Sequence, residues 1–399
     1  MLRATCVALA VAVCSSAVIA EKRSGDQVPQ GIDSLATFSG VFVNPGLNTD
    51  GDPQFIWPYT MVGSSPFGKG RGSSRDDETT FIGAPIVPVN IDLRNADGTP
   101  RFSTAGKRLV MDATPFVQPV LDSPLFSPTA FSSSDAPTQF TDAVQRAAFF
   151  TQIDRDWHTI LRPRVLPART LVLQTGYRFA TDADGNLIAV LVDATTFTNA
   201  LLPSAAGDTT SIMRAVESAG QIRTTDLTTF LLPNTFLFRD GDINNIISGF
   251  HNYDVRPGDR SNGFRERRYV MNYSTWVSPG LVAALFGRGF SDITALSHQL
   301  VDTFNDPFLT NGTPWWNGAA PGPCGNVLEG GDVLQGLGDP TFPITMNGFT
   351  YHPQNVALLP WFAGARRSPA IGGAFSYPDT TILTSAAAPQ QASCGVGLQ

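Results

Sequence analysis

Two side chains four residues apart, His298 and Asp302, could act together as metal ligands. Residues at positions i and i+4 of a helix lie on the same face, and imidazole nitrogen and carboxylate oxygen both bind zinc. The pair would therefore form half of the metal site of a zinc hydrolase. The residue after the histidine, where such an enzyme keeps its general base, is Gln299.

A third ligand could come from the segment LEGGD at residues 328–332, downstream of the pair. We select Glu329 for this position, with Asp332 as the alternative in the same segment. His251 could also line such a site, although a histidine in a strand is more often simply half-buried. The competing interpretation is that His298 and Asp302 belong to the solvated polar face of an ordinary surface helix.

The stretch from Ser291 to Phe308 predicts one amphipathic helix that would carry the pair. Ser291 can cap its start, and Pro307 ends it because the residue before a proline avoids the helical region. Apolar side chains repeat at helical spacing on one face, namely Ile293, Leu296, Leu300 and Phe304.

Residues 297–308, SHQLVDTFNDPF, resemble the S-H-E-x-x-E-W-x-x-D-P-F segment of a largely uncharacterised family of secreted microbial proteins. That segment is itself similar to the metal helix of the zincins. Further stretches of the chain match the family, so that the resemblance covers most of residues 55–365; they are 55–60, 121–124, 138–147, 327–332 and 358–362, together with Cys324. The resemblance implies a zincin-like site with zinc held by His298, Asp302 and Glu329.

The chain departs from the family segment at two positions. Asp302 replaces a glutamate, which keeps a carboxylate but shortens its reach by one methylene. Gln299 replaces the other glutamate, and glutamine cannot take up a proton. Loss of a general base slows a reaction by about 100- to 10,000-fold.

We therefore expect a secreted zincin-like protein with a degenerate metal site that acts by binding rather than by hydrolysis. One alternative is an active zinc-dependent peptidase that uses His251 or Glu329 as its base. Another is a non-enzymatic extracellular protein with a structural or glycan-binding role. Aromatic side chains would form its binding surface, namely Trp315, Trp316, Trp361 and Tyr351.

Residues 1–20 have the features of a secretory signal, with Arg3, an apolar stretch and a small-residue cleavage site. Lys22 and Arg23 follow directly and either mark a second cleavage or are ordinary residues of a loose N-terminus. Removing the signal takes away one basic and no acidic residue, so the mature chain is more acidic than the −7 of the whole sequence. This charge argues against nucleic acid and membrane partners and suits a soluble extracellular protein. As partners we consider an extracellular protein or a polysaccharide.

Two cysteines, Cys324 and Cys394, remain after the signal. In a secreted chain they would most simply form one disulfide. Asn272 begins the sequence Asn-Tyr-Ser and is the preferred site of N-glycosylation.

The pattern along the chain predicts an α+β fold, and we expect a monomer. A flexible leader at residues 21–50 would precede a β-rich part at 51–205, packed on a zincin-like α+β part at 206–399. The β-rich part includes a strand from Ile82 to Leu93, whose prolines suggest a sheet edge or a bend. It also includes a helix from Thr138 to Thr151.

Overall fold

A computed structural model describes residues 31–44, 55–67, 79–132, 136–205, 207–319, 324–365 and 367–387. It confirms the α+β fold class. The predicted signal, the dibasic pair and Cys394 lie outside the described residues.

An eight-stranded mixed sheet forms the centre of the molecule. Its main order is β1 (Ile32–Asp33), β14 (Glu266–Trp276), β10 (Leu227–Pro233), β4 (Thr79–Leu93) and β5 (Val110–Met111). β13 (Gly249–Arg256) pairs antiparallel with β14, and β6 (His158–Val165) and β7 (Arg169–Leu173) pair parallel with β4. Strands from both sides of residue 206 thus share this sheet.

A second sheet and several short hairpins complete the strands. The second sheet has the order β12 (Asp242–Ile247), β11 (Thr235–Arg239), β9 (Leu187–Asp193) and β8 (Tyr177–Thr181). The two-stranded pairs are β2 (Thr37–Asn44) with β3 (Phe55–Val62), β15 (Gly312–Asn317) with β16 (Cys324–Val327), β17 (Ile344–Met346) with β18 (Phe349–Tyr351), and β19 (Val356–Ala357) with β20 (Ser376–Tyr377).

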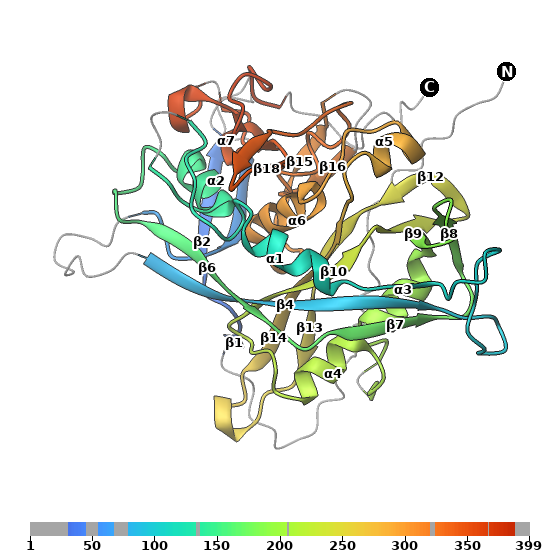
Figure 1. The fold of residues 1–399 in the computed structure, drawn as a ribbon. Helices are drawn as coiled ribbons and strands as arrows, with labels where there is room; N and C mark the ends of the chain where they lie inside the picture. The colour runs from blue at the N-terminus through green and yellow to red at the C-terminus, as the bar shows by residue number, and fades with distance from the viewer. Residues whose placement is uncertain are drawn as a thin grey trace, which may run out of the picture.

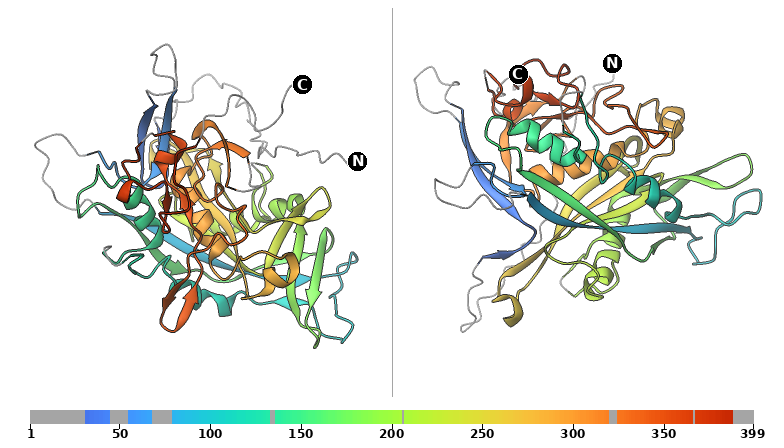
Figure 2. Two further views of the ribbon diagram at one scale, coloured as in Figure 1. Left: turned by 90° about the horizontal axis from the view of Figure 1, so that it is seen from above. Right: turned by 60° about the vertical axis from the view of Figure 1, so that its left-hand side comes forward.

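The helices cover both faces of the central sheet. They are α1 (Val117–Leu121), α2 (Phe140–Ala148), α3 (Ala194–Leu201), α4 (Ile212–Ser218), α5 (Leu281–Phe286), α6 (Thr294–Asn305) and α7 (Leu359–Phe362), with 3-10 turns at Thr114–Phe116, Arg260–Asn262 and Ile371–Gly373. In Figures 1 and 2, α2 and α6 lie on one side of β4 and α4 lies on the other.

Alternating side chains of the strands enter two separate apolar clusters. In β10, Leu227 and Leu231 pack in the cluster that contains α6, whereas Phe230 and Leu232 pack in the cluster of α3 and α4. Successive side chains of a strand point to opposite faces, so a sheet with helices on both faces is apolar on both. The continuous burial of β10 follows from this arrangement.

Helix α6 is shorter than predicted and buried on every side. It runs from Thr294 to Asn305, and all of its residues are buried against β13, β14, β3 and α2 or under the C-terminal loops. The side chain of Ser291 does not cap it; instead Thr294 Oγ1 donates a hydrogen bond to the Ser291 carbonyl at 2.7 Å. The interpretation of its polar side as a solvated face is wrong.

Two predictions about the N-terminal part are also wrong. Residues 32–44, expected in a flexible leader, contain β1 and β2, and β1 pairs with the start of β14. This partner lies far along the chain, so no local pattern revealed it. Strand β4 lies inside the sheet, so its prolines do not mark a sheet edge, whereas a bend there stays a prediction. The pairing of β4 with β6 ends at Ile86 and its pairing with β7 begins at Val89. Pro85 and Pro88, which have no amide hydrogen to donate, lie close to this change of partner.

We predict that Leu300→Ala, on the buried α6, lowers the free energy of unfolding by about 2–5 kcal/mol, because it leaves a cavity in the core. The matched control is Leu285→Ala on α5, whose side chain is 42% exposed and whose loss should change stability by less than about 0.5 kcal/mol. Urea denaturation of both variants measures the difference. Equal effects would contradict the central position of α6.

Candidate metal centre

His298 is held in one orientation by a glutamine from a distant loop. Its Nδ1 lies 3.1 Å from Gln354 Oε1, while Gln354 Nε2 donates to the Gly331 carbonyl at 2.5 Å. An amide oxygen can only accept, so Nδ1 must carry the proton in this pair. The other ring nitrogen, Nε2, is the one left to bind a ligand. Outer partners fix the tautomer of metal-binding histidines in the same way.

Asp302 is fixed by the backbone of Gly331, in the loop at residues 328–333. One carboxylate oxygen, Oδ1, accepts a hydrogen bond from the Gly331 amide at 2.7 Å. The other, Oδ2, lies 2.7 Å from His298 Nε2, as expected for side chains four residues apart on a helix. Gly331 lies so close to α6 that a Cβ at this position would be 2.7 Å from His298 Cγ. This position therefore requires glycine.

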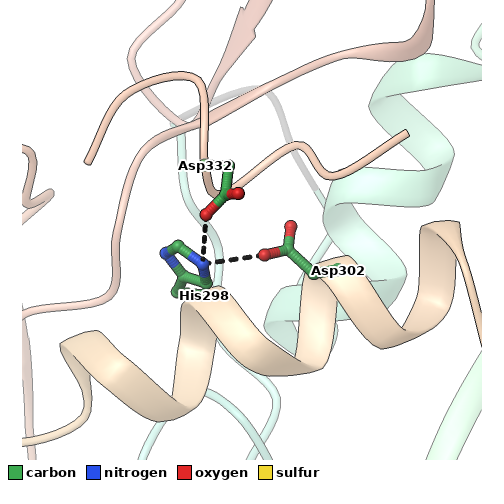
Figure 3. Close-up of side chains that lie close together, drawn as sticks. All are labelled: His298, Asp302 and Asp332. Atoms are coloured by element: carbon green, nitrogen blue, oxygen red, sulfur yellow. Dashed lines mark ion pairs between the residues drawn. The ribbon is translucent and has the colours of Figure 1, made fainter. Parts of the chain in front are cut away.

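The third member of the cluster is Asp332, whose Oδ1 lies 3.2 Å from His298 Nε2 (Figure 3). One ligand atom from each of His298, Asp302 and Asp332 falls within 4.8 Å of the others. Figure 3 shows the two helical side chains and the loop carboxylate pointing toward one another. Three such atoms can surround one zinc ion, since zinc binds nitrogen and oxygen at about 2.0–2.2 Å.

Glu329, selected from the sequence as the third ligand, is not in this cluster. Its Oε1 lies 3.7 Å from His251 Nε2, and its carboxyl group forms a hydrogen bond with Asp332. The close contact of Gly331 with His298 brings the next residue, Asp332, to the ring nitrogen. Glu329 and His251 therefore lie beside the cluster as neighbours of its loop carboxylate.

The centre contains more acidic than basic side chains. Carboxyl groups of Asp302, Asp306, Glu329 and Asp332 interact there, with His251 and His298 as the basic groups. Burial, and then the charges of Asp332 and Asp302, raise the pKa of Glu329 well above its usual value. Burial would also raise the pKa of Asp332, but the hydrogen bond and charge of His298, the hydrogen bond from Glu329 and the charge of His251 together outweigh it and lower that pKa. Glu329 thus holds its proton more strongly than an ordinary carboxyl group.

His298 holds a proton strongly when no cation is bound. Burial alone would lower the pKa of its ring, but the charges of Asp302 and Asp332 and the hydrogen bonds to them raise that pKa well above its usual value. A proton on Nε2 and a metal ion would therefore compete for the same position.

Gln299 does not face the cluster. It lies on the α6 side that packs on β13, where a Cβ added to Gly249 would lie 2.7 Å from Gln299 Cγ. Its Oε1 is buried and has no hydrogen-bond partner among the described residues. The position of the usual general base is thus occupied by a packing side chain.

Several other predicted sites look different in the fold. Asn272 is fully buried in β14, where its amide donates to Thr229 Oγ1, so the folded protein cannot carry a glycan there. Trp316 and Trp361 are buried and pack against each other, and Tyr351 is buried elsewhere in the same core. Their burial removes most of the aromatic surface that was expected to bind sugars. Cys324 begins β16; its pairing with Cys394 stays a prediction.

Two residues of the centre were not selected from the sequence. Gln354 lies in the short sequence His-Pro-Gln-Asn, which has no metal-site pattern, and Asp332 was only the alternative to Glu329. The adjacent glycines 330 and 331 were a usable signal, because paired glycines often mark a close backbone approach.

Comparison with known proteins found no matching family model, no similar curated protein and no similar solved structure. The resemblance to the secreted microbial family therefore stays a prediction. Within the described residues, no helix has the length and apolar character needed to cross a membrane.

We predict that the metal-free protein loses stability as the pH rises from about 5 to 9. His298 and Glu329 both have raised pKa values, so the folded state binds more protons than the unfolded state in this interval, and the free energy of unfolding falls. Melting temperatures in the presence of a chelator measure the decline.

Glu329→Gln should make this decline shallower, because a neutral amide replaces the carboxyl group that must ionise. Glu266→Gln, at a more exposed position of β14, is the matched control and should leave the slope unchanged. An unaltered slope in Glu329→Gln would show that this carboxyl group titrates normally.

Proposed function

We propose that this protein binds one divalent cation, zinc, through His298 Nε2, Asp302 Oδ2 and Asp332 Oδ1. The observation that carries the proposal is the convergence of these three atoms on a buried point, with the unused atoms of His298 and Asp302 already held by Gln354 and Gly331. Such outer hydrogen bonds hold a ligand in the form and orientation that a metal requires.

Charge supports a cation in this place. Burying several carboxyl groups together is unfavourable unless positive charge compensates them. A bound zinc ion would supply that charge next to Asp302, Asp332 and Glu329. One nitrogen and two oxygens form a donor set that zinc accepts.

The proposal is for binding rather than catalysis. Gln299 cannot take up a proton, and its side chain packs against β13. We therefore infer a zincin-like pseudoenzyme whose metal orders the loop at 328–333 against α6. We also propose that the protein is secreted, which rests on the signal-like residues 1–20 and the acidic composition.

We predict that the purified protein binds about one zinc ion and that His298→Ala and Asp332→Asn abolish this binding. Gln354→Ala should weaken it by about 10- to 100-fold, since it removes only the partner that orients His298. Isothermal titration calorimetry measures affinity and stoichiometry.

The control is His158→Ala, which removes a histidine outside the cluster that is paired with Asp142. It should bind zinc like the original protein. Undiminished zinc binding by His298→Ala would overturn the proposed site, whatever the affinity of the protein for zinc elsewhere.

A second candidate is a zinc-dependent hydrolase in which Glu329 acts as general base. The observation that favours it is the raised pKa of Glu329, because a carboxyl group with a pKa nearer neutrality can take up and release a proton. Its side chain is 18% exposed, so a small substrate could reach it.

Digestion of a broad peptide library tests this candidate. A hydrolase would show chelator-sensitive cleavage that Glu329→Gln reduces by at least about 100-fold. Our proposal predicts no cleavage, and also none from Gln299→Glu, because the new carboxylate would be buried against Gly249.

A further inference from the structure

A basic pocket lies on the opposite face of the sheet from the metal centre. Its cavity of about 370 Å³ is lined by Arg214, Val255, Arg256, Pro257, Arg267 and Tyr269. In β13, His251 points to α6, whereas Asp254 points to Arg214 of α4. Positions an odd number apart in a strand face opposite sides, so the pocket is independent of the metal centre.

The deepest basic group in this pocket has an unused donor. The Arg214 side chain is only 4% exposed and forms ion pairs with Glu217 and Asp254, each at 3.2 Å. Its Nε is buried and has no hydrogen-bond partner among the described residues. A buried donor without an acceptor is unfavourable, and a ligand oxygen in the pocket would satisfy it.

The two acids next to Arg214, Glu217 and Asp254, interact with each other. Both Glu217 Oε1 and Asp254 Oδ2 are buried without a well-aligned donor among the described residues. Burial, then the hydrogen bond to Asp254, raises the pKa of Glu217 to about 8. Glu217 therefore holds its proton more strongly than an ordinary carboxyl group.

Two further guanidinium groups face the opening of the pocket. Arg256 pairs with Glu217, and Arg267 pairs with Asp259, whose side chain is 58% exposed. Both arginine side chains remain partly exposed, at 33% and 22%. Three guanidinium groups therefore line one pocket of an acidic protein.

We propose that this pocket binds a small oxyanion, the carboxylate or phosphate group of a soluble ligand, between Arg214, Arg256 and Arg267. The planar guanidinium group donates paired hydrogen bonds that match both kinds of anion. Val255, Pro257 and the ring of Tyr269 provide a less polar wall for the remainder of the ligand.

Calorimetric titration with inorganic phosphate and, separately, with citrate at constant ionic strength tests the proposal. We expect saturable binding of at least one of them, and the stronger of the two identifies a phosphate or a carboxylate ligand. Arg256→Gln and Arg267→Gln should each weaken that binding by about 10- to 100-fold, because each removes charged hydrogen bonds.

The matched control is Arg178→Gln, which removes the same charge from an exposed position of β8 in the other sheet. It should bind the anions like the original protein. Absence of saturable binding, or equal weakening by Arg178→Gln, would overturn the proposal. Arg267→Gln is informative even if Arg256→Gln fails to fold, because Arg267 pairs with the exposed Asp259.

Discussion

The contact between α6 and the Gly331 backbone is the constraint on which the metal centre depends. Gly331 lies so close to His298 that no larger residue fits, and its amide and carbonyl bind Asp302 and Gln354. This one contact buries the polar side of α6, orients the imidazole and brings Asp332 to it. A helix that is polar on one side can be buried throughout only because that side is satisfied in this way.

The central sheet separates two chemically different environments. On the α6 face, four carboxyl groups interact with two histidines. On the α4 face, three arginines line one pocket. The adjacent strands β13 and β14 contribute to both environments, because alternate residues of a strand point in opposite directions. The proposed cation and anion sites therefore lie on opposite faces of the sheet.

The sequence predicted the local features of the candidate site well. The spacing of His298 and Asp302, the apolar face of α6 and the stop at Pro307 are all consequences of helical periodicity. The absence of the usual general base follows from residue identity alone, because position 299 is a glutamine.

By itself, then, the sequence determined the α+β class, the position of the key helix and its pair of candidate ligands, because these follow from patterns within a few residues. Only the tertiary structure decided that the polar side of α6 is buried, that Asp332 replaces Glu329 and that Gln354 orients His298. It also decided that Asn272 is buried and that β1 joins β14. Each of these depends on contacts between residues far apart in the chain, and local periodicity carries no information about such contacts.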